Sequence, residues 1–288
     1  MDIFLNEKAE AERIIARRDL GVKPSHSLFL LAKYYRFVMG YKRSKIISEL
    51  KDFIKSTGIH YREMDWDKIV EKQVDRSRNK PLVDIEYIGV TQSELNCIAE
   101  LKSLPLERIA FTTLCLAKYH NILNEKNNDW ISTGQKTLFR LSGVNNKSRY
   151  DKAMMIHKLY VLGIIQPSLI TGNPNLKVKI IDDSSPIILK IVDMRELGKE
   201  YMLYKGKKYE RCKDCGRLFL KRANSQLYCK NCQGYQKLNT KTLTCCDCGK
   251  EFVVDSKANH KKRCDECQHE YIKKYDRERK SKKSVNQF

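Results

Sequence analysis

The feature that most constrains this chain is a cysteine pattern that occurs twice toward its C-terminal end. Each copy has the form C-x-x-C-G-x-x-F, followed after a hairpin-length spacer by a second C-x-x-C. The eight cysteines are Cys212, Cys215, Cys229 and Cys232 in the first copy and Cys245, Cys248, Cys264 and Cys267 in the second. Two thiolates separated by two residues on a tight turn can reach one ion at Zn–S distances of about 2.3 Å. The repeat therefore predicts two structural Zn²⁺ ions, each closed by four cysteines with no position left for a catalytic water.

The residues beside the cysteines suit small metal-held units. Gly216 and Gly249 directly follow the second ligand of each copy, where the turn needs unrestricted backbone. Phe219 and Phe252 are expected to give each unit a small apolar floor, and units of this size do not fold without their metal. Helix-compatible sequence after the last ligand favours a treble clef for the second copy, whereas a polar run after the first copy favours a plain zinc ribbon.

Several alternatives to this ligand assignment stay open. Cys246 neighbours Cys245 and could replace it, although only Cys245 keeps the two-residue gap to Cys248. His260 and His269 could also act as ligands. An iron–sulfur cluster and redox-active C-x-x-C pairs are competing interpretations, but the strand and helix that surround a thioredoxin-type motif are absent from the sequence pattern.

The chain is strongly basic, and the charge is concentrated around these cysteines. The formal net charge is +21, and residues 205–288 hold 23 Lys and Arg against 10 Asp and Glu, a net +13. Such a balance favours a polyanionic partner, because each phosphate neutralised by a cation releases condensed counterions. The candidate nucleic-acid contacts in this part are Lys221, Arg222, Lys257, Lys261, Lys262, Arg263, Lys273, Lys274 and Arg277. A solvated lysine-rich tail is the alternative interpretation.

Apolar periodicity predicts a mainly α fold with small β elements. The expected parts are a helical domain at 1–103, a winged-helix-like domain at 104–183, a connector at 184–209, one zinc unit at 210–236 and a second at 243–288 with a basic helix or tail. Within the second part, the pattern predicts the order helix, strand, helix, turn, helix, hairpin. This order, over about 80 residues, resembles the winged-helix family.

The resemblance implies that the longer helix, at 147–161, enters the DNA major groove with its N-terminal end. The candidate contacts there are Asn145, Asn146, Lys147, Ser148 and Arg149, because amides pair with adenine edges and Arg with guanine or phosphate. Ala153, Ile156, Leu159 and Tyr160 share one helix face and are expected to be buried. Asp151 would repel phosphate, and winged helices also serve as protein-binding modules.

No Walker loop, nucleophile elbow or nuclease-like carboxylate cluster is visible, so an enzyme is not expected. HNH nucleases, which are built on treble clefs, are the nearest enzyme class, but the second copy lacks their paired histidines. The whole chain resembles uncharacterised phage or prophage proteins of low-GC Gram-positive bacteria with a winged-helix-like region and C-terminal tandem C-x-x-C-G ribbons. This resemblance conveys no established activity.

The sequence thus predicts a zinc-containing DNA-binding protein, either a transcription regulator or a replication accessory factor. The alternatives are an adaptor or inhibitor that binds a host or phage enzyme such as a polymerase through its zinc units, and an RNA-binding protein. The N-terminus lacks the features of a signal peptide, and no segment reaches the roughly 18 apolar residues of a membrane span. We therefore expect a cytoplasmic protein, in a bacterium or a phage-infected cell, without a membrane partner.

Overall fold

The computed structural model describes residues 3–21, 23–58, 62–170, 173–232, 240–255 and 261–285. The chain divides into two compact units. The first unit comprises Met1–Glu210 and Gly216–Asn224, and the second comprises Arg211–Cys215 and Ser225–Phe288. No helix among the described residues is both long enough and apolar enough to cross a membrane.

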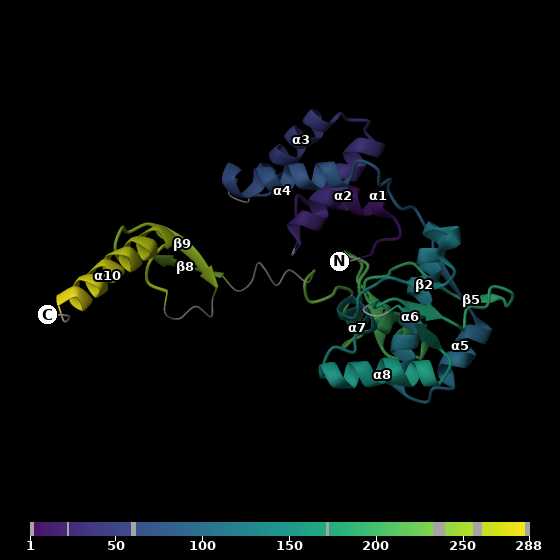
Figure 1. Cartoon of the computed structure of the whole chain (residues 1–288). Coiled ribbons are helices and arrows are strands. Elements are labelled where there is room, and N and C mark those ends of the chain that lie inside the picture. The colour runs from purple at the N-terminus through teal and green to yellow at the C-terminus, as the bar shows by residue number, and fades with distance from the viewer. Residues whose placement is uncertain are drawn as a thin grey trace. The chain divides into compact units, whose positions relative to one another are not determined.

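Four helices near the N-terminus lie together (Figure 1), and their buried side chains form one apolar core. They are α1 (Glu7–Arg17), α2 (Pro24–Phe37), α3 (Arg43–Ser56) and α4 (Glu63–Arg76). Each helix turns apolar side chains at helical spacing toward this core, as Leu31, Ile46 and Val70 illustrate. Lys33 of α2 is also buried, where it pairs with Glu7 of α1. The structure thus confirms the helical character predicted for this part of the chain.

A second core forms around α6, which is buried along most of its length. The elements up to residue 178 are β1 (Ile88–Thr91), α5 (Gln92–Ala99), α6 (Leu104–Leu123), the 3-10 turn η1 (Glu125–Asn127), β2 (Trp130–Ile131), α7 (Gln135–Ser142), α8 (Arg149–Val161), β3 (Ile165–Pro167) and β4 (Leu176–Val178). Strands β2, β4 and β3 form one antiparallel sheet in that order. From α6 onward, the order of helices and strands is the predicted one.

Residues 184–209, expected as a connector, instead belong to this second core. They contain β5 (Ile187–Ile191) and α9 (Leu197–Tyr204), and β5 pairs antiparallel with β1. Met194, Leu197 and Tyr201 are fully buried beside residues of α6. The β1–β5 pairing joins segments about a hundred residues apart, so no local pattern in either strand indicates it.

The described residues of the cysteine-rich part form two short hairpins and one helix. The hairpins pair β6 (Tyr209–Arg211) with β7 (Leu218–Leu220) and β8 (Thr240–Thr244) with β9 (Glu251–Asp255), and the helix is α10 (Asp265–Val285). The start of α10 directly after Cys264 agrees with the helix predicted at the last ligands of the second copy.

Candidate metal centres and nucleic-acid interface

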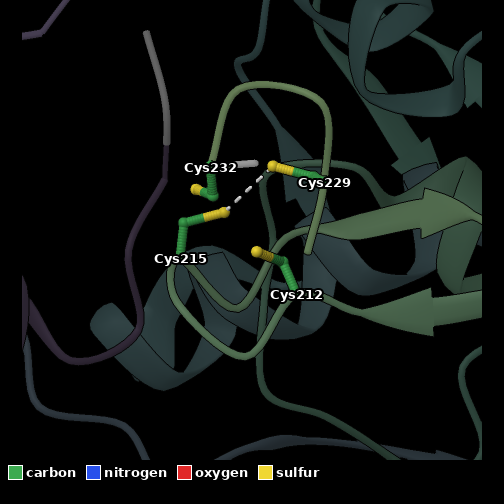
Figure 2. Close-up of side chains that lie close together, drawn as sticks. All are labelled: Cys212, Cys215, Cys229 and Cys232. Atoms are coloured by element: carbon green, nitrogen blue, oxygen red, sulfur yellow. Dashed lines mark hydrogen bonds between the residues drawn. The ribbon is translucent and has the colours of Figure 1, made fainter. Parts of the chain in front are cut away.

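The structure brings the four cysteines of the first copy together, as Figure 2 shows. Cys212 and Cys215 lie on the turn between β6 and β7, and Cys229 and Cys232 lie on a turn that follows β7. Their four sulfurs all lie within 4.8 Å of one another, and the Sγ atoms of Cys215 and Cys229 are 3.7 Å apart. These four residues are called the first cluster.

The cysteines of the second copy form an equivalent group, called the second cluster. Cys245 and Cys248 lie on the turn between β8 and β9, Cys264 precedes α10, and Cys267 lies in its first turn. The four sulfurs again lie within 4.8 Å of one another, and those of Cys248 and Cys264 are 3.7 Å apart.

These distances fit a tetrahedral metal ion. Four sulfurs at about 2.3 Å from one zinc ion stand about 3.8 Å from one another. The observed 3.7 Å separations match that edge, whereas a disulfide would bring two sulfurs to about 2.05 Å. All eight cysteines are free of disulfides. Each cluster could therefore hold one metal ion, which is consistent with two zinc sites.

The backbone of the ligand turns takes the conformation that the sequence predicts. Gly216 and Gly249 have φ of 70° and 71°, in the left-handed region that glycine enters without strain. In the second cluster, the Gly249 N–H donates to the Cys245 carbonyl at 3.0 Å and closes the turn. Neither glycine could be replaced by another residue without strain at the metal turn.

Hydrogen bonds in the turns favour the thiolate form at one cysteine of each cluster. The backbone N–H groups of Cys264 and Cys248 donate to the Cys245 sulfur and lower the pKa of its thiol to about 6. Burial raises the pKa of Cys212, but backbone N–H groups on its ligand turns donate to its sulfur and bring the pKa to about 6. Thiolate is the form in which cysteine binds a metal.

The last proton of each cluster is held more tightly. Burial and hydrogen bonds to neighbouring groups raise the pKa of Cys232, and the neighbouring thiols raise that of Cys267. Four sulfurs packed this closely do not all ionise unless a cation compensates their charge, and a bound divalent ion does so. The clusters are thus built for a cation.

The structure decides between the candidate ligand residues that it describes. Cys246 is exposed, lies outside the second cluster, and its thiol donates to an Asp247 carboxylate oxygen at 3.4 Å. Cys245 is the ligand candidate. His269 lies exposed on α10 and is not part of the cluster, and His260 lies outside the described residues.

The five polar residues predicted to contact DNA lie together at the start of α8. Asn145, Asn146, Lys147, Ser148 and Arg149 are all exposed. Ile156 and Leu159, two to three turns further along α8, are buried in the core that contains α6. The helix is therefore fixed to the first unit while its N-terminal end faces solvent.

Ser148 has a role that the sequence analysis missed. Its hydroxyl accepts from the Asp151 N–H at 3.0 Å, and the Asp151 carboxylate accepts from the Ser148 N–H at 3.2 Å. The side-chain and backbone hydrogen bonds from Ser148 lower the pKa of Asp151. The Ser-x-x-Asp spacing is the signal that could have predicted this capping box. Ser148 therefore caps the N-terminus of α8, and Asp151 completes the capping box from the first turn.

The predicted basic contacts of the cysteine-rich part differ in their surroundings. Lys262, Lys273, Lys274 and Arg277 are exposed, the last three of them on α10. Three others have acidic partners: Lys261 pairs with Asp265 at 2.7 Å, Arg263 with Asp247 at 2.6 Å, and Lys221 with Glu210 at 3.3 Å. Lys221 and Arg222 directly follow β7. Lys257 lies outside the described residues.

Comparisons of the chain with protein-family models, with curated proteins and with solved structures found no match. The resemblances to winged-helix proteins and to phage-type proteins therefore stay predictions. The functional argument rests on the residues and their geometry.

Proposed function

We propose that this protein is a non-enzymatic, zinc-containing nucleic-acid-binding protein of the bacterial or phage-infected cytoplasm, acting in transcription regulation or replication. In this proposal α6–α8 and the sheet β2–β4–β3 form a winged helix, and α8 lies in the DNA major groove. The observation that carries it is the exposed, polar and basic N-terminal end of α8 on a helix otherwise held by buried Ile156 and Leu159.

The charges at the N-terminal end of α8 suit contacts with bases better than nonspecific binding to the phosphate backbone. Lys147 and Arg149 bring two cations, and Asp151 returns one negative charge in the first turn. Asn145 and Asn146 add amides, which can pair with the adenine edge. Binding through α8 alone would therefore depend on bases, and phosphate contacts from elsewhere would supply most of the affinity.

In this proposal, the two cysteine clusters position the cations that make these phosphate contacts. With its metal bound, the second cluster anchors a treble clef whose helix α10 presents Lys273, Lys274 and Arg277 to solvent. The first cluster would hold a ribbon. Each phosphate neutralised by such cations adds about −0.9 to the slope of log affinity against log salt concentration.

The test is binding of the zinc-loaded chain to random-sequence duplex DNA over a range of salt concentrations. We expect a steep negative slope, reduced by about 1 for each phosphate contact that an alanine variant of Lys273, Lys274 or Arg277 removes. The matched control is Lys55→Ala, an exposed lysine on α3. A flat dependence on salt, or equal losses in the control, would refute the proposal. Parallel titrations with single-stranded DNA and with RNA decide between the polymers.

A protein-binding adaptor is the second candidate, because α10 also exposes apolar surface. The side chains of Tyr271, Ile272 and Tyr275 are about half exposed, and the Arg263 guanidinium lies 4.1 Å from the centre of the Tyr271 ring. Aromatic residues and arginine are enriched in protein interfaces. A stoichiometric partner recovered after nuclease treatment, and lost in Ile272→Asp, would favour this function over nucleic-acid binding.

A further inference from the structure

The first unit contains a cavity of about 320 Å³ that the proposed function does not use. Its wall comes from α1, α2, the loop between them, α7 and the residue after Gly216. None of the candidate DNA contacts on α8 lines it. The volume falls at the lower end of the range for small-molecule sites, about 300–1,000 Å³.

Positive side chains dominate the polar part of the wall. They are Arg13, Arg17, Lys23, Arg140 and Arg217, and they face two acidic residues, Glu10 and Asp19. Leaving His26 aside, five positive and two negative charges give a net of +3. Both acidic residues already accept hydrogen bonds: the Glu10 carboxylate from the Arg13 guanidinium at 2.8 Å, and Asp19 from the Gly21 N–H at 2.7 Å. The cavity therefore favours an anion.

The rest of the wall is apolar and aromatic. Ile14, Leu20 and Leu30 line the cavity and are buried in the core of α1–α4. Phe4 and His26 also line it, with ring planes 14° apart and centres separated by 5.9 Å. A flat, weakly polar group could lie against this surface and be shielded from water.

An anion-binding subsite beside an apolar one restricts the class of ligand. Guanidinium groups match phosphate oxygens in paired hydrogen bonds, and three of the cations besides Arg13 are arginines. The apolar wall suits a nucleobase, and the volume suits one nucleotide and not a polymer. We propose that this cavity binds a nucleoside monophosphate, with its phosphate among the arginines and its base on the apolar wall.

A ligand held there would contact residues far apart in the sequence. Arg17 ends α1, Lys23 directly precedes α2, Arg140 lies on α7, and Arg217 comes from the segment after the first pair of cysteines. Because the cavity requires all of these segments, the ligand would stabilise their arrangement by binding only the folded first unit.

The test is calorimetric titration of the zinc-loaded full chain with AMP, GMP, adenosine and inorganic phosphate. We expect one AMP or GMP per chain with a Kd below about 1 mM, and weaker binding of adenosine and of phosphate alone by at least about tenfold. Arg140→Gln should weaken AMP binding by about tenfold or more. Arg17→Gln and Lys23→Gln, single variants at two exposed residues, should each do the same. Arg62→Gln, an exposed arginine outside the cavity, is the matched control.

Circular dichroism and metal content show whether each variant folds, and the two exposed variants remain informative if Arg140→Gln does not. No saturable binding of AMP or GMP, equal affinity for phosphate alone, or equal loss in Arg62→Gln would overturn the proposal. If a 5′-phosphorylated oligonucleotide competes with AMP and depends on Arg17 and Lys23 in the same way, the bound nucleotide is the 5′ end of a nucleic acid. Failure of the oligonucleotide to compete would assign the site to a free nucleotide.

Discussion

Replacement of Cys264 and Cys267 by serine should unfold the second cluster and its hairpin. Among the side chains that the structure describes between Thr240 and Val285, the buried ones are Cys245, Val254 and Cys264. Burial of one valine contributes about 1.5–3 kcal/mol, whereas structural zinc contributes an apparent 10–16 kcal/mol, roughly, in small fingers. Loss of the metal therefore removes the main stabilising interaction of this segment.

Two measurements check this expectation. The metal content, determined by mass spectrometry, should fall from two ions per chain to one. Hydrogen exchange should show loss of protection for the amides of β8 and β9, while the amides of α6 in the first unit keep theirs. Cys246→Ser is the matched control, because Cys246 is adjacent in sequence but lies outside the cluster. This control should retain two ions and the protected hairpin.

The reasoning fails under two outcomes. One is wild-type protein that purifies folded and without metal. The other is a double variant that binds a single ion yet keeps native exchange rates in β8 and β9. In either case the hairpin and α10 would be stabilised by interactions other than the four thiolates.

Two further substitutions test the second core. Gly198→Ala would place a Cβ atom 1.9 Å from the Ser142 carbonyl oxygen and should cost at least about 1–3 kcal/mol in chemical denaturation. Gly134→Ala meets no atom within 4 Å of its Cβ and should cost less, about 1 kcal/mol at most, because Gly134 is the N-cap of α7. Lys118→Met should cost about 3–5 kcal/mol, because it leaves the fully buried Glu94 carboxylate without its cation at 2.7 Å. Adding Glu94→Gln should recover part of that loss, and no recovery would contradict the ion-pair explanation.

The metal ligands could be predicted from sequence because their signal is local. Two cysteines on one tight turn reach the same ion whatever the rest of the chain does, and the repeat identifies the second pair. The doubtful choice between Cys245 and Cys246 was decided correctly by the same two-residue spacing. The capping box at Thr91 and Glu94 is equally local, because its Thr-x-x-Glu spacing can be read directly from the sequence.

The second core was harder to predict because its contacts are distant in sequence. Residues 83–88 alternate between apolar and polar side chains, a pattern typical of a strand. The strand observed is Ile88–Thr91, where β5 supplies the hydrogen-bonding partner. On α8, Ala153 and Tyr160 share the apolar pattern of the helix, yet both are exposed. A periodic pattern shows which residues share a face, but the width of the contact with the core decides how many of them are buried.

The two clusters should release their metals at different rates, although their sequence motifs are nearly the same. Every cysteine of the first cluster is buried or half-buried, whereas Cys248 of the second is exposed. A chelator can therefore approach the second ion at a sulfur that the first cluster does not offer. We expect excess chelator to remove the two ions in two phases, and the Cys264→Ser and Cys267→Ser double variant to show the slow phase alone. A fast phase in that variant would show that exposure of Cys248 does not control release.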